Sequence, residues 1–386
     1  MPRVCLVTLS RSDYASMRPV AQAALAEAGI DARIVAGGSH CLARFGRTIE
    51  QIAADGLPVH ALAEFLHETD DSPIDLAAAY ARACAEFVRI FAREAPDLVF
   101  VIGDRWEMLA VVSAASMLRV PVAHHSGGDI TQGSSDNQTR YALTVLSHLH
   151  LVALPEHRER LIHMGEEAWR VTTTGEPALS ALADYASTVP DIHAHLGLTA
   201  NEPFVLATFH PTSFDEHPPQ AQAETFLRGL ETIDCAIVLT APNPDAASEI
   251  FLARFKAFAA ARRRVRLRDS LGSNAYYAAM AKALCMVGNS SSGLWEGPSF
   301  RLPVVNIGQR QQGRIHGDNV IHCMLDAQAI ASAIHRACRP SFREQLSGAN
   351  PYVSQDTLPL ILACLKKPHD RAALLAKRFI DPLTLL

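Results

Sequence analysis

The chain alternates between short apolar runs and longer alanine-rich stretches. The apolar runs are rich in Val, Ile and Leu and are followed by turn signals, which predicts strands at 3–9, 32–36, 98–102, 120–123, 149–153, 169–173, 204–209, 235–240, 264–267, 284–288 and 302–307. The stretches between them have helical spacing and predict helices at 15–28, 76–94, 107–118, 136–148, 221–230, 273–283 and 326–338. Strands that alternate with helices form parallel sheets covered on both faces, so the predicted fold class is α/β.

The length of the chain predicts two domains. One ordinary hydrophobic core does not serve 386 residues. A Gly-Glu-Pro sequence at 175–177 marks the expected boundary. We therefore expect an N-terminal Rossmann-like domain over 1–175 and a C-terminal Rossmann-like domain over 176–368, facing a cleft. A second crossing is expected within 350–370, so that a last helix within 369–386 could pack on the first domain.

Composition indicates a soluble globular protein. Apolar residues make up 49% and charged residues 19% of the chain, and the net charge is −5. Without a basic block, nucleic acid is not expected as the main partner. No stretch approaches the roughly 20 apolar residues of a membrane span, and the run at 3–9 lacks the length and flanks of a signal peptide. Eight scattered cysteines without metal-ligand spacing indicate a reducing, cytoplasmic location.

Polar and charged residues follow the predicted strands. In open parallel sheets this is where ligands bind. In the first half these residues are Ser10, Arg11, Asp13, His40, Asp104, Arg105, His124, His125, Ser126, Asp129, Asp136 and Arg140. In the second half they are His210, Asn243, Asp245, Arg310 and Arg314. A purely structural protein has little reason to gather so many such groups, so the pattern indicates a binding or catalytic site.

The stretch 285–296 has the features of a phosphate site. An apolar run ends in a glycine and is followed by an asparagine, three serines and residues able to start a helix. Unpaired backbone N–H groups and the helix dipole attract anions at such a point, so phosphate is expected at Ser290, Ser291 and Ser292. Glu296 would lie in the first turn, within reach of sugar hydroxyls. Serine-rich helix caps also occur without any ligand, and this alternative stays open.

Several candidates also have a structural explanation. Asp13, Asp104 and Asp136 could cap the helices that follow them. His40 and His124 could be packed and hydrogen-bonded in the core, and the two arginines of the last loop could pair with surface carboxylates. The sequence lacks G-x-x-x-x-G-K-[ST], G-x-G-x-x-G, H-E-x-x-H and G-x-S-x-G, which removes the P-loop, dinucleotide, zinc-protease and hydrolase classes.

A series of short motifs runs in order along most of the chain. They are Gly-Asp-Arg-Trp-Glu-Met at 103–108, Gly-Gly-Asp-Ile-Thr-Gln-Gly-x-x-Asp-Asn-x-x-Arg at 127–140, Ser-His-Leu-His at 147–150, Gly-Glu-Pro at 175–177, His-Pro-Thr at 210–212, Pro-Asn-Pro-Asp at 242–245, Gly-Asn-Ser-Ser-Ser-Gly at 288–293 and Asn-Ile-Gly-x-Arg-Gln-x-Gly-Arg at 306–314. Together they resemble the UDP-N-acetylglucosamine 2-epimerase family. They look most similar to its hydrolysing branch, which feeds sialic, legionaminic and related nonulosonic acid pathways.

The resemblance implies a fold like that of the GT-B glycosyltransferases, with UDP held chiefly by the second domain. On the matching positions Asp104, Asp136 and His210 would be catalytic, with Asp129 or Ser126 completing the set. The positions that would bind the UDP-sugar are Arg11, His40, Arg105, Arg140, Asn243, Ser290, Ser291, Ser292, Glu296, Arg310 and Arg314. A homodimer is also implied by the family.

The implied reaction explains why these residue types are needed. The hydrogen on C2 of the sugar is not acidic, so its removal has to be coupled to departure of UDP from C1. A carboxylate takes the proton while cationic and hydrogen-bonding groups stabilise the leaving pyrophosphate. The glycal then adds water at C1 and regains a proton at C2 on the opposite face. This chemistry requires two acid/base groups and no metal or redox cofactor.

One position departs from the family pattern. Just ahead of the glycine pair at 127–128, where Glu or His is expected, the chain has Ser126. A serine is a poor proton carrier at neutral pH, so His125 or Asp129 takes the role, or Ser126 relays through water, or the substrate differs. Gln132 likewise stands where Glu is expected. The sugar therefore stays open between UDP-GlcNAc and a 4-acetamido-6-deoxy analogue.

Three other functions remain as alternatives. A non-hydrolysing UDP-GlcNAc 2-epimerase would re-add UDP to the glycal. A GT-B-type glycosyltransferase would pass the sugar to an acceptor, but the sequence shows no basic or amphipathic patch for one. A catalytically silent nucleotide-sugar sensor is suggested by Ser126 alone.

Overall fold

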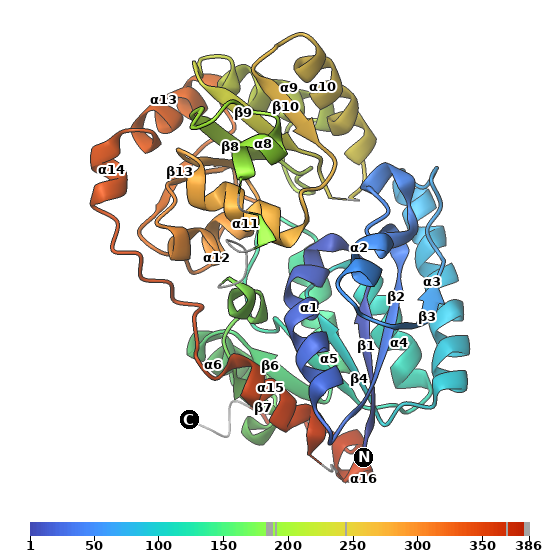
Figure 1. The fold of residues 1–386 in the computed structure, drawn as a ribbon. Coiled ribbons are helices and arrows are strands. Elements are labelled where there is room, and N and C mark those ends of the chain that lie inside the picture. Colours follow the sequence, from blue (N-terminus) through green and yellow to red (C-terminus); the bar gives the residue numbers. More distant parts are fainter. Residues whose placement is uncertain (183–187, 190, 244, 368–369, 382–386) are drawn as a thin grey trace. The chain divides into compact units, whose positions relative to one another are not determined.

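The computed structural model describes residues 1–182, 188–189, 191–243, 245–367 and 370–381 (Figure 1). By its internal contacts the chain forms two compact units. Unit 1 consists of Met1–Asp129, Asp136–Ser180 and Tyr352–Leu386, and unit 2 of Ile130–Ser135 and Ala181–Pro351. Each unit has its own parallel sheet, and each is described here by itself.

Unit 1 is built around a seven-stranded sheet. Its strands are β1 (Arg3–Thr8), β2 (Asp31–Gly37), β3 (Val59–Ala63), β4 (Leu98–Ile102), β5 (Val122–His125), β6 (Leu149–Val152) and β7 (Val171–Thr173). They lie in the order β3-β2-β1-β4-β5-β6-β7, and every pairing is parallel. Its helices are α1 (Arg11–Ala26), α2 (Ile49–Ala54), α3 (Pro73–Glu94), α4 (Trp106–Met117), α5 (Asp136–Leu146), α6 (Pro155–His163), α15 (Thr357–Lys366) and α16 (Arg371–Leu375).

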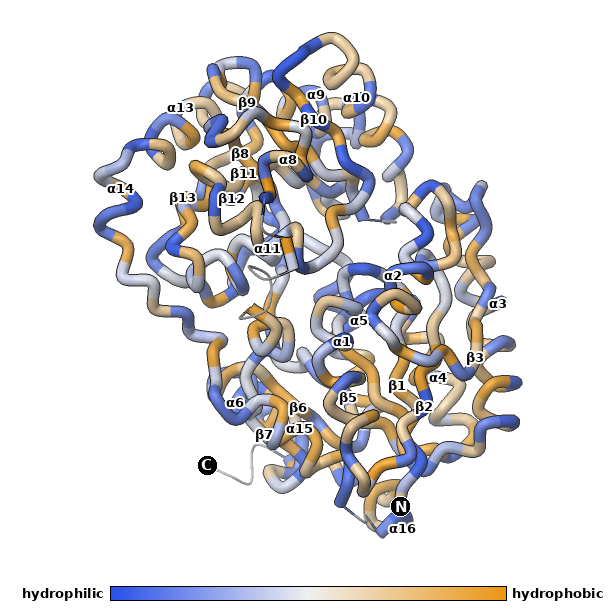
Figure 2. Tube along the Cα trace, in the orientation of Figure 1, coloured by the Kyte–Doolittle hydropathy of each residue, from blue (hydrophilic) through white to orange (hydrophobic). Residues whose placement is uncertain are grey.

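Both faces of this sheet are buried. Along β1, Cys5 and Val7 pack toward α3 and α4, whereas Val4 and Leu6 pack toward α1 and α15. Alternate residues of a strand point to opposite faces, so a strand buried on both sides is apolar throughout. In Figure 2 the hydrophobic residues along these strands appear orange. The continuous apolar runs of the sequence are therefore the central strands.

Unit 2 repeats the same architecture with a six-stranded sheet. Its strands are β8 (Phe204–Thr208), β9 (Ala236–Thr240), β10 (Val265–Arg268), β11 (Met286–Gly288), β12 (Val304–Ile307) and β13 (Val320–Cys323), in the order β10-β9-β8-β11-β12-β13. Its helices are α8 (Ile192–Leu196), α9 (Pro219–Leu230), α10 (Ser248–Ala260), α11 (Gly272–Lys282), α12 (Ser292–Trp295), α13 (Ala327–Ala337) and α14 (Pro340–Glu344). A cluster of stacked phenylalanines, Phe209, Phe226 and Phe251, joins β8 to α9 and α10.

The predicted fold class is confirmed. Both units are parallel α/β structures with the strand order of a Rossmann-like sheet. Two strands, β3 and β13, were not predicted, and both lie at the edge of a sheet. In both strands buried residues are interrupted by exposed ones on the outward face, so the sequence shows no continuous apolar run. Leu62 in β3, for example, is 43% exposed.

The chain returns to unit 1 at Tyr352, inside the interval where a second crossing was expected. Ile361 and Leu365 of α15 are buried against the α1 side of the sheet. This burial places residues 352–367 with unit 1, although the expected second domain extended to 368. The expected boundary at 368/369 itself lies outside the described residues. The main passage to unit 2 follows Ser180, a few residues after the predicted Gly-Glu-Pro boundary, and residues 130–135 within the expected first domain also belong to unit 2.

Candidate active site

In each sheet the strand order reverses beside the first strand of the unit. The reversal lies between β1 and β4 in unit 1 and between β8 and β11 in unit 2. At such a reversal the carboxyl ends of neighbouring strands border a crevice where ligands bind. The predicted site residues that follow these four strands are therefore positioned by the topology.

The predicted acid/base residues of unit 1 lie around Arg140. Its side chain is fully buried on α5 and forms an ion pair with Asp104, which follows β4. It also donates to the backbone oxygen of Asp129 (3.0 Å) and to Asn137 Oδ1 (3.3 Å). Burial by itself lowers the pKa of Arg140, but the charges of Asp104, Asp129 and Asp136 outweigh it and raise the pKa. The structure thus brings three carboxylates around one guanidinium.

Two expectations bear on this cluster. Asp104 does not cap the helix after it, because the N-cap of α4 is Arg105 and its side chain forms no cap hydrogen bond. Arg140 is buried, and both of its terminal nitrogens donate to protein groups. Its expected role in substrate binding stays a prediction. Asp136 is the first residue of α5 and lies at its N-terminus.

Ser126 is held in a fixed hydrogen bond. Its backbone has a φ of 82°, and its Oγ lies 3.1 Å from Nδ1 of His125. Nε2 of His125 lies 3.0 Å from the carbonyl oxygen of Gly175. A carbonyl only accepts, so Nε2 carries the hydrogen and Nδ1 accepts from the serine. Burial lowers the pKa of His125, although Glu176 nearby acts to raise it. Neither residue is arranged as a proton carrier.

His40 serves the interior of unit 1. Thr8 donates to Asp13, so His40 Nε2 donates to Thr8 (3.0 Å) and Nδ1 accepts from Thr48 (2.6 Å). Burial lowers the pKa of His40 to about 3. Both ring nitrogens thus bond to threonines, as the structural explanation expected, and the role of His40 in substrate binding stays a prediction.

Asp13 takes part in capping the N-terminus of α1, as its structural explanation predicted. It accepts hydrogen bonds from the backbone N–H of Ser10 (3.0 Å) and from its hydroxyl (2.9 Å). Burial raises the pKa of Asp13 to about 7 in spite of these bonds. Arg11 is the first residue of the same helix and is partly exposed. Arg105, expected on the substrate, forms a buried ion pair with Glu107 (3.0 Å).

Asn289 joins the two strand ends at the reversal in unit 2. Its Oδ1 accepts from the backbone N–H of His210 (2.8 Å), and its Nδ2 donates to the His210 carbonyl (2.8 Å). The ring of His210 is oriented by Asn243, whose backbone N–H donates to Nδ1 (3.0 Å). In the neutral ring the hydrogen is then on Nε2. His210 is thus presented as a hydrogen-bond donor.

The three serines lie beside these strand ends. Gly288 at the end of β11 has a φ of 146°, and a Cβ there would overlap the backbone of Thr208 in β8, so only glycine permits this approach. Ser290 Oγ lies 3.0 Å from Ser292 Oγ, which lies 2.8 Å from the hydroxyl of Tyr276. The helix that follows, α12, has only one turn, so the helix dipole expected there is that of a single turn. Backbone and hydroxyl donors remain as the groups that could bind phosphate.

The last loop of the predicted site folds back onto Asn289. Arg310 donates to the Asn289 carbonyl (3.2 Å), and so does Gln311 (2.8 Å). Arg314 donates to Gln311 Oε1 (2.8 Å), and its guanidinium lies 4.6 Å from the ring of Trp295. Glu296 follows Trp295 and is buried at the end of the one-turn helix, whereas it was expected in a first turn.

A short segment between two unit 1 carboxylates packs with unit 2. Residues 130–135 belong to unit 2, whereas Asp129 and Asp136 on either side of them belong to unit 1. The backbone N–H of Gln132 donates to the Gln312 carbonyl (3.1 Å). A Cβ on Gly133 would lie 2.5 Å from the carbonyl carbon of Gln309 and 2.8 Å from the nitrogen of Arg310. We call residues 130–135 the strap.

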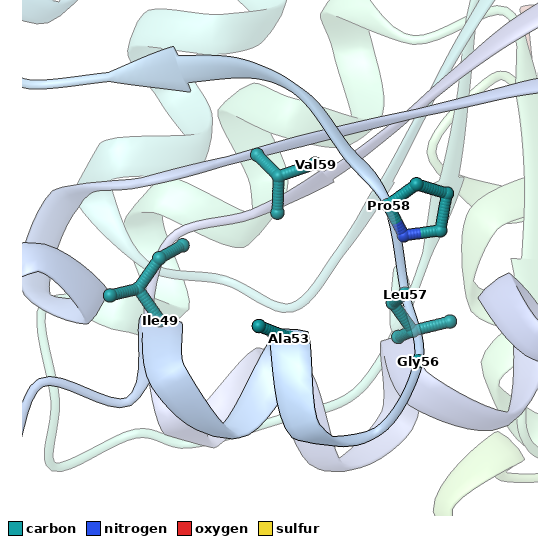
Figure 3. Close-up of a pocket in the computed structure, with 6 residues that line it drawn as sticks. All are labelled: Ile49, Ala53, Gly56, Leu57, Pro58 and Val59. Carbon is teal, nitrogen blue, oxygen red and sulfur yellow. The ribbon is translucent and has the colours of Figure 1, made fainter.

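A hollow elsewhere in unit 1 has no polar side chain. It has a volume of 520 Å³ and is lined by Ile49, Ala53, Gly56, Leu57, Pro58 and Val59, between α2 and β3 (Figure 3). None of these six side chains can take part in acid/base chemistry. Within the described ranges, no three His, Cys, Asp or Glu residues are grouped to hold a metal ion. None of the helices there is long and apolar enough to cross a membrane.

Comparison with known families identifies the chain. The sequence model of the UDP-N-acetylglucosamine 2-epimerase family matches residues 22–366. The chain belongs to this family. A GDP/UDP-N,N'-diacetylbacillosamine 2-epimerase (hydrolyzing) from Campylobacter jejuni is 28% identical over 98% of this chain and 99% of its own. A UDP-N,N'-diacetylbacillosamine 2-epimerase (hydrolyzing) from Legionella pneumophila is 30% identical over 87% of this chain and 88% of its own. These relatives support the hydrolysing branch and an enzyme of this type.

Solved structures of other members of the 2-epimerase family share the fold. A UDP-GlcNAc 2-epimerase from Neisseria meningitidis, bound to UDP-GlcNAc, has a TM-score of 0.80 at 16% identity and covers 94% of this chain and 99% of its own. A Methanocaldococcus jannaschii UDP-GlcNAc 2-epimerase, in complex with UDP-GlcNAc and UDP, has a TM-score of 0.77 at 15% identity, covering 94% and 99%. The GT-B-like fold class expected for this 2-epimerase family member is thus confirmed.

Some residues near the candidate site of this 2-epimerase were not proposed from the sequence. Gln311 and Trp295 are next in sequence to Arg310 and Glu296, which were predicted to bind the substrate. That position is the sequence signal by which they could have been found. His157 and Arg160 on α6 followed no predicted polar strand end, and the Ser16 hydroxyl donates to Glu176 (2.6 Å) from mid-helix. These contacts arise from packing between elements far apart in sequence, which periodicity does not reveal.

Proposed function

We propose that the protein is a hydrolysing 2-epimerase that acts on a UDP-linked 2-acetamido sugar and releases UDP and the free 2-epimer. The observation that carries the proposal is the set of three carboxylates around buried Arg140 at the strand reversal of unit 1. Epimerisation at C2 needs groups that take a proton from one face and return one to the other. Asp104, Asp129 and Asp136 are the groups proposed for this exchange.

Unit 2 is assigned to the nucleotide. Ser290, Ser291 and Ser292 would bind phosphate through hydroxyl and backbone N–H groups, and buried Glu296 would accept from ribose hydroxyls. Arg310 and Arg314 would add positive charge for the pyrophosphate, which is needed most as UDP leaves. His210, with its hydrogen on Nε2, would donate to an oxygen of the leaving group.

The reaction balances without an added reagent. A carboxylate accepts the C2 hydrogen as a proton, the C2–H electrons form the C1–C2 double bond, and the C1–O bond breaks with its electrons leaving on UDP. Water then adds its oxygen to C1 of the glycal and gives one proton to a carboxylate. A protonated carboxylic acid on the other face returns a proton to C2. The products are the free 2-epimer and UDP.

Asp129 is the preferred group for the role that Ser126 cannot fill. The Ser126 hydroxyl is directed at His125, and both nitrogens of His125 are engaged. Asp129 follows three residues later, has a side chain that is 3% exposed, and belongs to the carboxylate cluster. A carboxylate changes its protonation far more readily than a serine hydroxyl at neutral pH.

For the sugar, we propose the 2,4-diacetamido-2,4,6-trideoxy class named by two relatives, with UDP-GlcNAc as the competing substrate. The product would then feed nonulosonic acid synthesis of the legionaminic type rather than the sialic type. A proton NMR time course in D2O with both UDP-sugars tests substrate and reaction together. We expect free 2-epimer, UDP and deuterium at C2. A nucleotide-linked epimer would indicate the non-hydrolysing reaction, and absence of deuterium at C2 would rule out the proposed chemistry.

The cytoplasmic homodimer remains part of the proposal. All eight cysteines are free, which suits a reducing compartment. The dimer rests on the family resemblance alone. Light scattering coupled to size-exclusion chromatography measures the mass in solution, and a monomer at micromolar concentration would contradict this part.

A further inference from the structure

The loop that carries Asp129 rests directly on helix α6. Gly128 has a φ of 77°, and a Cβ there would overlap the His157 carbonyl oxygen and lie 3.0 Å from the His157 Cα. Only a glycine allows this backbone-to-backbone approach. Arg160, three residues further along α6, donates to the carbonyl of Gly128. The backbone on one side of Asp129 is therefore held by α6.

A second arginine holds the other side. Arg140 of α5 donates to the backbone oxygen of Asp129 at 3.0 Å. Two guanidinium groups from two helices thus hold consecutive carbonyls of the loop, those of Gly128 and Asp129. What remains to be oriented is the carboxylate of Asp129.

His157 faces that carboxylate. Its Nε2 lies 3.5 Å from Asp129 Oδ1, and the two side chains are 2% and 3% exposed. The ring packs at 6.3 Å from the ring of Tyr352, a tilted contact that restricts its rotation. Tyr352 is itself 1% exposed. The imidazole is therefore placed by its surroundings.

We propose that His157 is the positioning residue for Asp129, an inference that rests on the proposed function. By attracting the carboxylate toward α6, the imidazole sets the side-chain rotamer of Asp129. Without it, the carboxylate turns toward the guanidinium of Arg140, which already donates to the Asp129 carbonyl and binds Asp104. Small displacements of an acid/base group cost large factors in rate, because proton transfer requires close and aligned atoms.

The first test compares two replacements of His157 on the UDP-sugar that the wild-type protein turns over. His157→Leu fills the space without a donor, whereas the amide of His157→Gln places a donor near the position of Nε2. We expect kcat to fall about 100-fold in the leucine variant and about fivefold in the glutamine variant, with KM changed less than about threefold in both. His163→Leu, at an exposed histidine of the same helix, is the matched control and should leave kcat unchanged.

A double-mutant cycle provides the decisive measurement. If His157 acts through Asp129, then His157→Leu has no further effect on kcat in an Asp129→Asn background. Equal losses for leucine and glutamine, or an undiminished leucine effect in the Asp129→Asn background, would overturn the proposal. If the leucine variant does not fold by circular dichroism, His157→Asn replaces it, because its shorter amide does not reach the Nε2 position. A wild-type protein that turns over no UDP-sugar would instead contradict the proposed function.

Discussion

The two units use the same sheet topology but hold their candidate-site residues in place by different contacts. Unit 1 buries charge: Arg140 with its carboxylates, and Arg105 with Glu107. Unit 2 uses a neutral frame in which Asn289 links strand ends and loop through amide and carbonyl hydrogen bonds. Acid/base chemistry needs groups that change charge, whereas retention of a nucleotide needs fixed donors. We therefore expect substitutions in the unit 1 site to reduce turnover and substitutions in the unit 2 site to weaken UDP binding.

The largest expected effect is loss of turnover without loss of UDP binding. Asp104→Asn removes the carboxylate beside Arg140, so kcat should fall by about 10²–10⁴-fold, the range for loss of a general acid or base. Calorimetry should give an unchanged Kd for UDP. Asp97→Asn is the control, because Asp97 lies at the opposite end of β4 and accepts from the backbone N–H of Arg3. Turnover that survives in Asp104→Asn would remove acid/base chemistry from unit 1.

Acid should destabilise unit 1 before unit 2. Burial lowers the pKa of His40 and His124 to about 3 and that of His148 to about 4. The unfolded chain takes up protons below its pKa near 6.5, so this stability is complete above pH 6.5 and is lost as the pH falls toward the folded values. From pH 7.5 to 5.5 the three histidines together lower the free energy of unfolding by about 4 kcal/mol.

Asp13 opposes part of that loss. Its folded pKa of about 7 lies above the unfolded value, so its contribution is complete at acidic pH and is lost as the pH rises through 7. From pH 7.5 to 5.5 Asp13 adds about 2 kcal/mol to the free energy of unfolding. The net loss for the three histidines and Asp13 together is therefore about 2 kcal/mol. Protection factors of backbone amides, measured by hydrogen exchange at pH 7.5 and 5.5, should fall more in β4 and β5 than in β8 and β9. An equal fall in both sheets would refute the contrast between the units.

The assignment of the nucleotide to unit 2 predicts a loss of UDP binding, which Asp104→Asn is expected to leave unchanged. Glu296→Ala should weaken UDP binding about tenfold, because a charge-assisted hydrogen bond to a ribose hydroxyl contributes roughly 1.5 kcal/mol or more. Titration of UDP measures it. Glu224→Ala, at an exposed ion pair with Arg254, serves as the control. An unchanged Kd in Glu296→Ala would place the ribose elsewhere.

The smallest effect concerns the strap. In Gly133→Ala the added methyl group would overlap the backbone of Gln309 and Arg310, so the strap or the Arg310 loop has to shift. We expect Kd for UDP to rise about threefold, which corresponds to roughly 0.6 kcal/mol. Ser135→Ala changes the same segment without adding volume and should bind UDP normally. A wild-type Kd in Gly133→Ala would separate the strap from the nucleotide loop.

Much of the fold followed from local patterns. The apolar runs at 3–9 and 204–209 correspond to β1 and β8, because a strand buried on both faces is apolar at every position. The strands β3 and β13 were missed because exposed residues such as Leu62 and His322 interrupt their apolar residues. The predicted site residues were placed at strand ends, but the sequence did not distinguish positioning from binding. His40 and Arg140, for example, were predicted as substrate ligands, and in the structure both bond to protein groups.

The sequence by itself determined the α/β class, the two-part organisation and the family, because these depend on periodicity and on motifs read residue by residue. The tertiary structure decided which side chains share a partner. It placed Asp104, Asp129 and Asp136 around Arg140, closed the Ser126 hydroxyl onto His125, and set His157 of α6 against Asp129. These contacts join elements that are distant along the chain, and their geometry depends on how helices pack on the sheet.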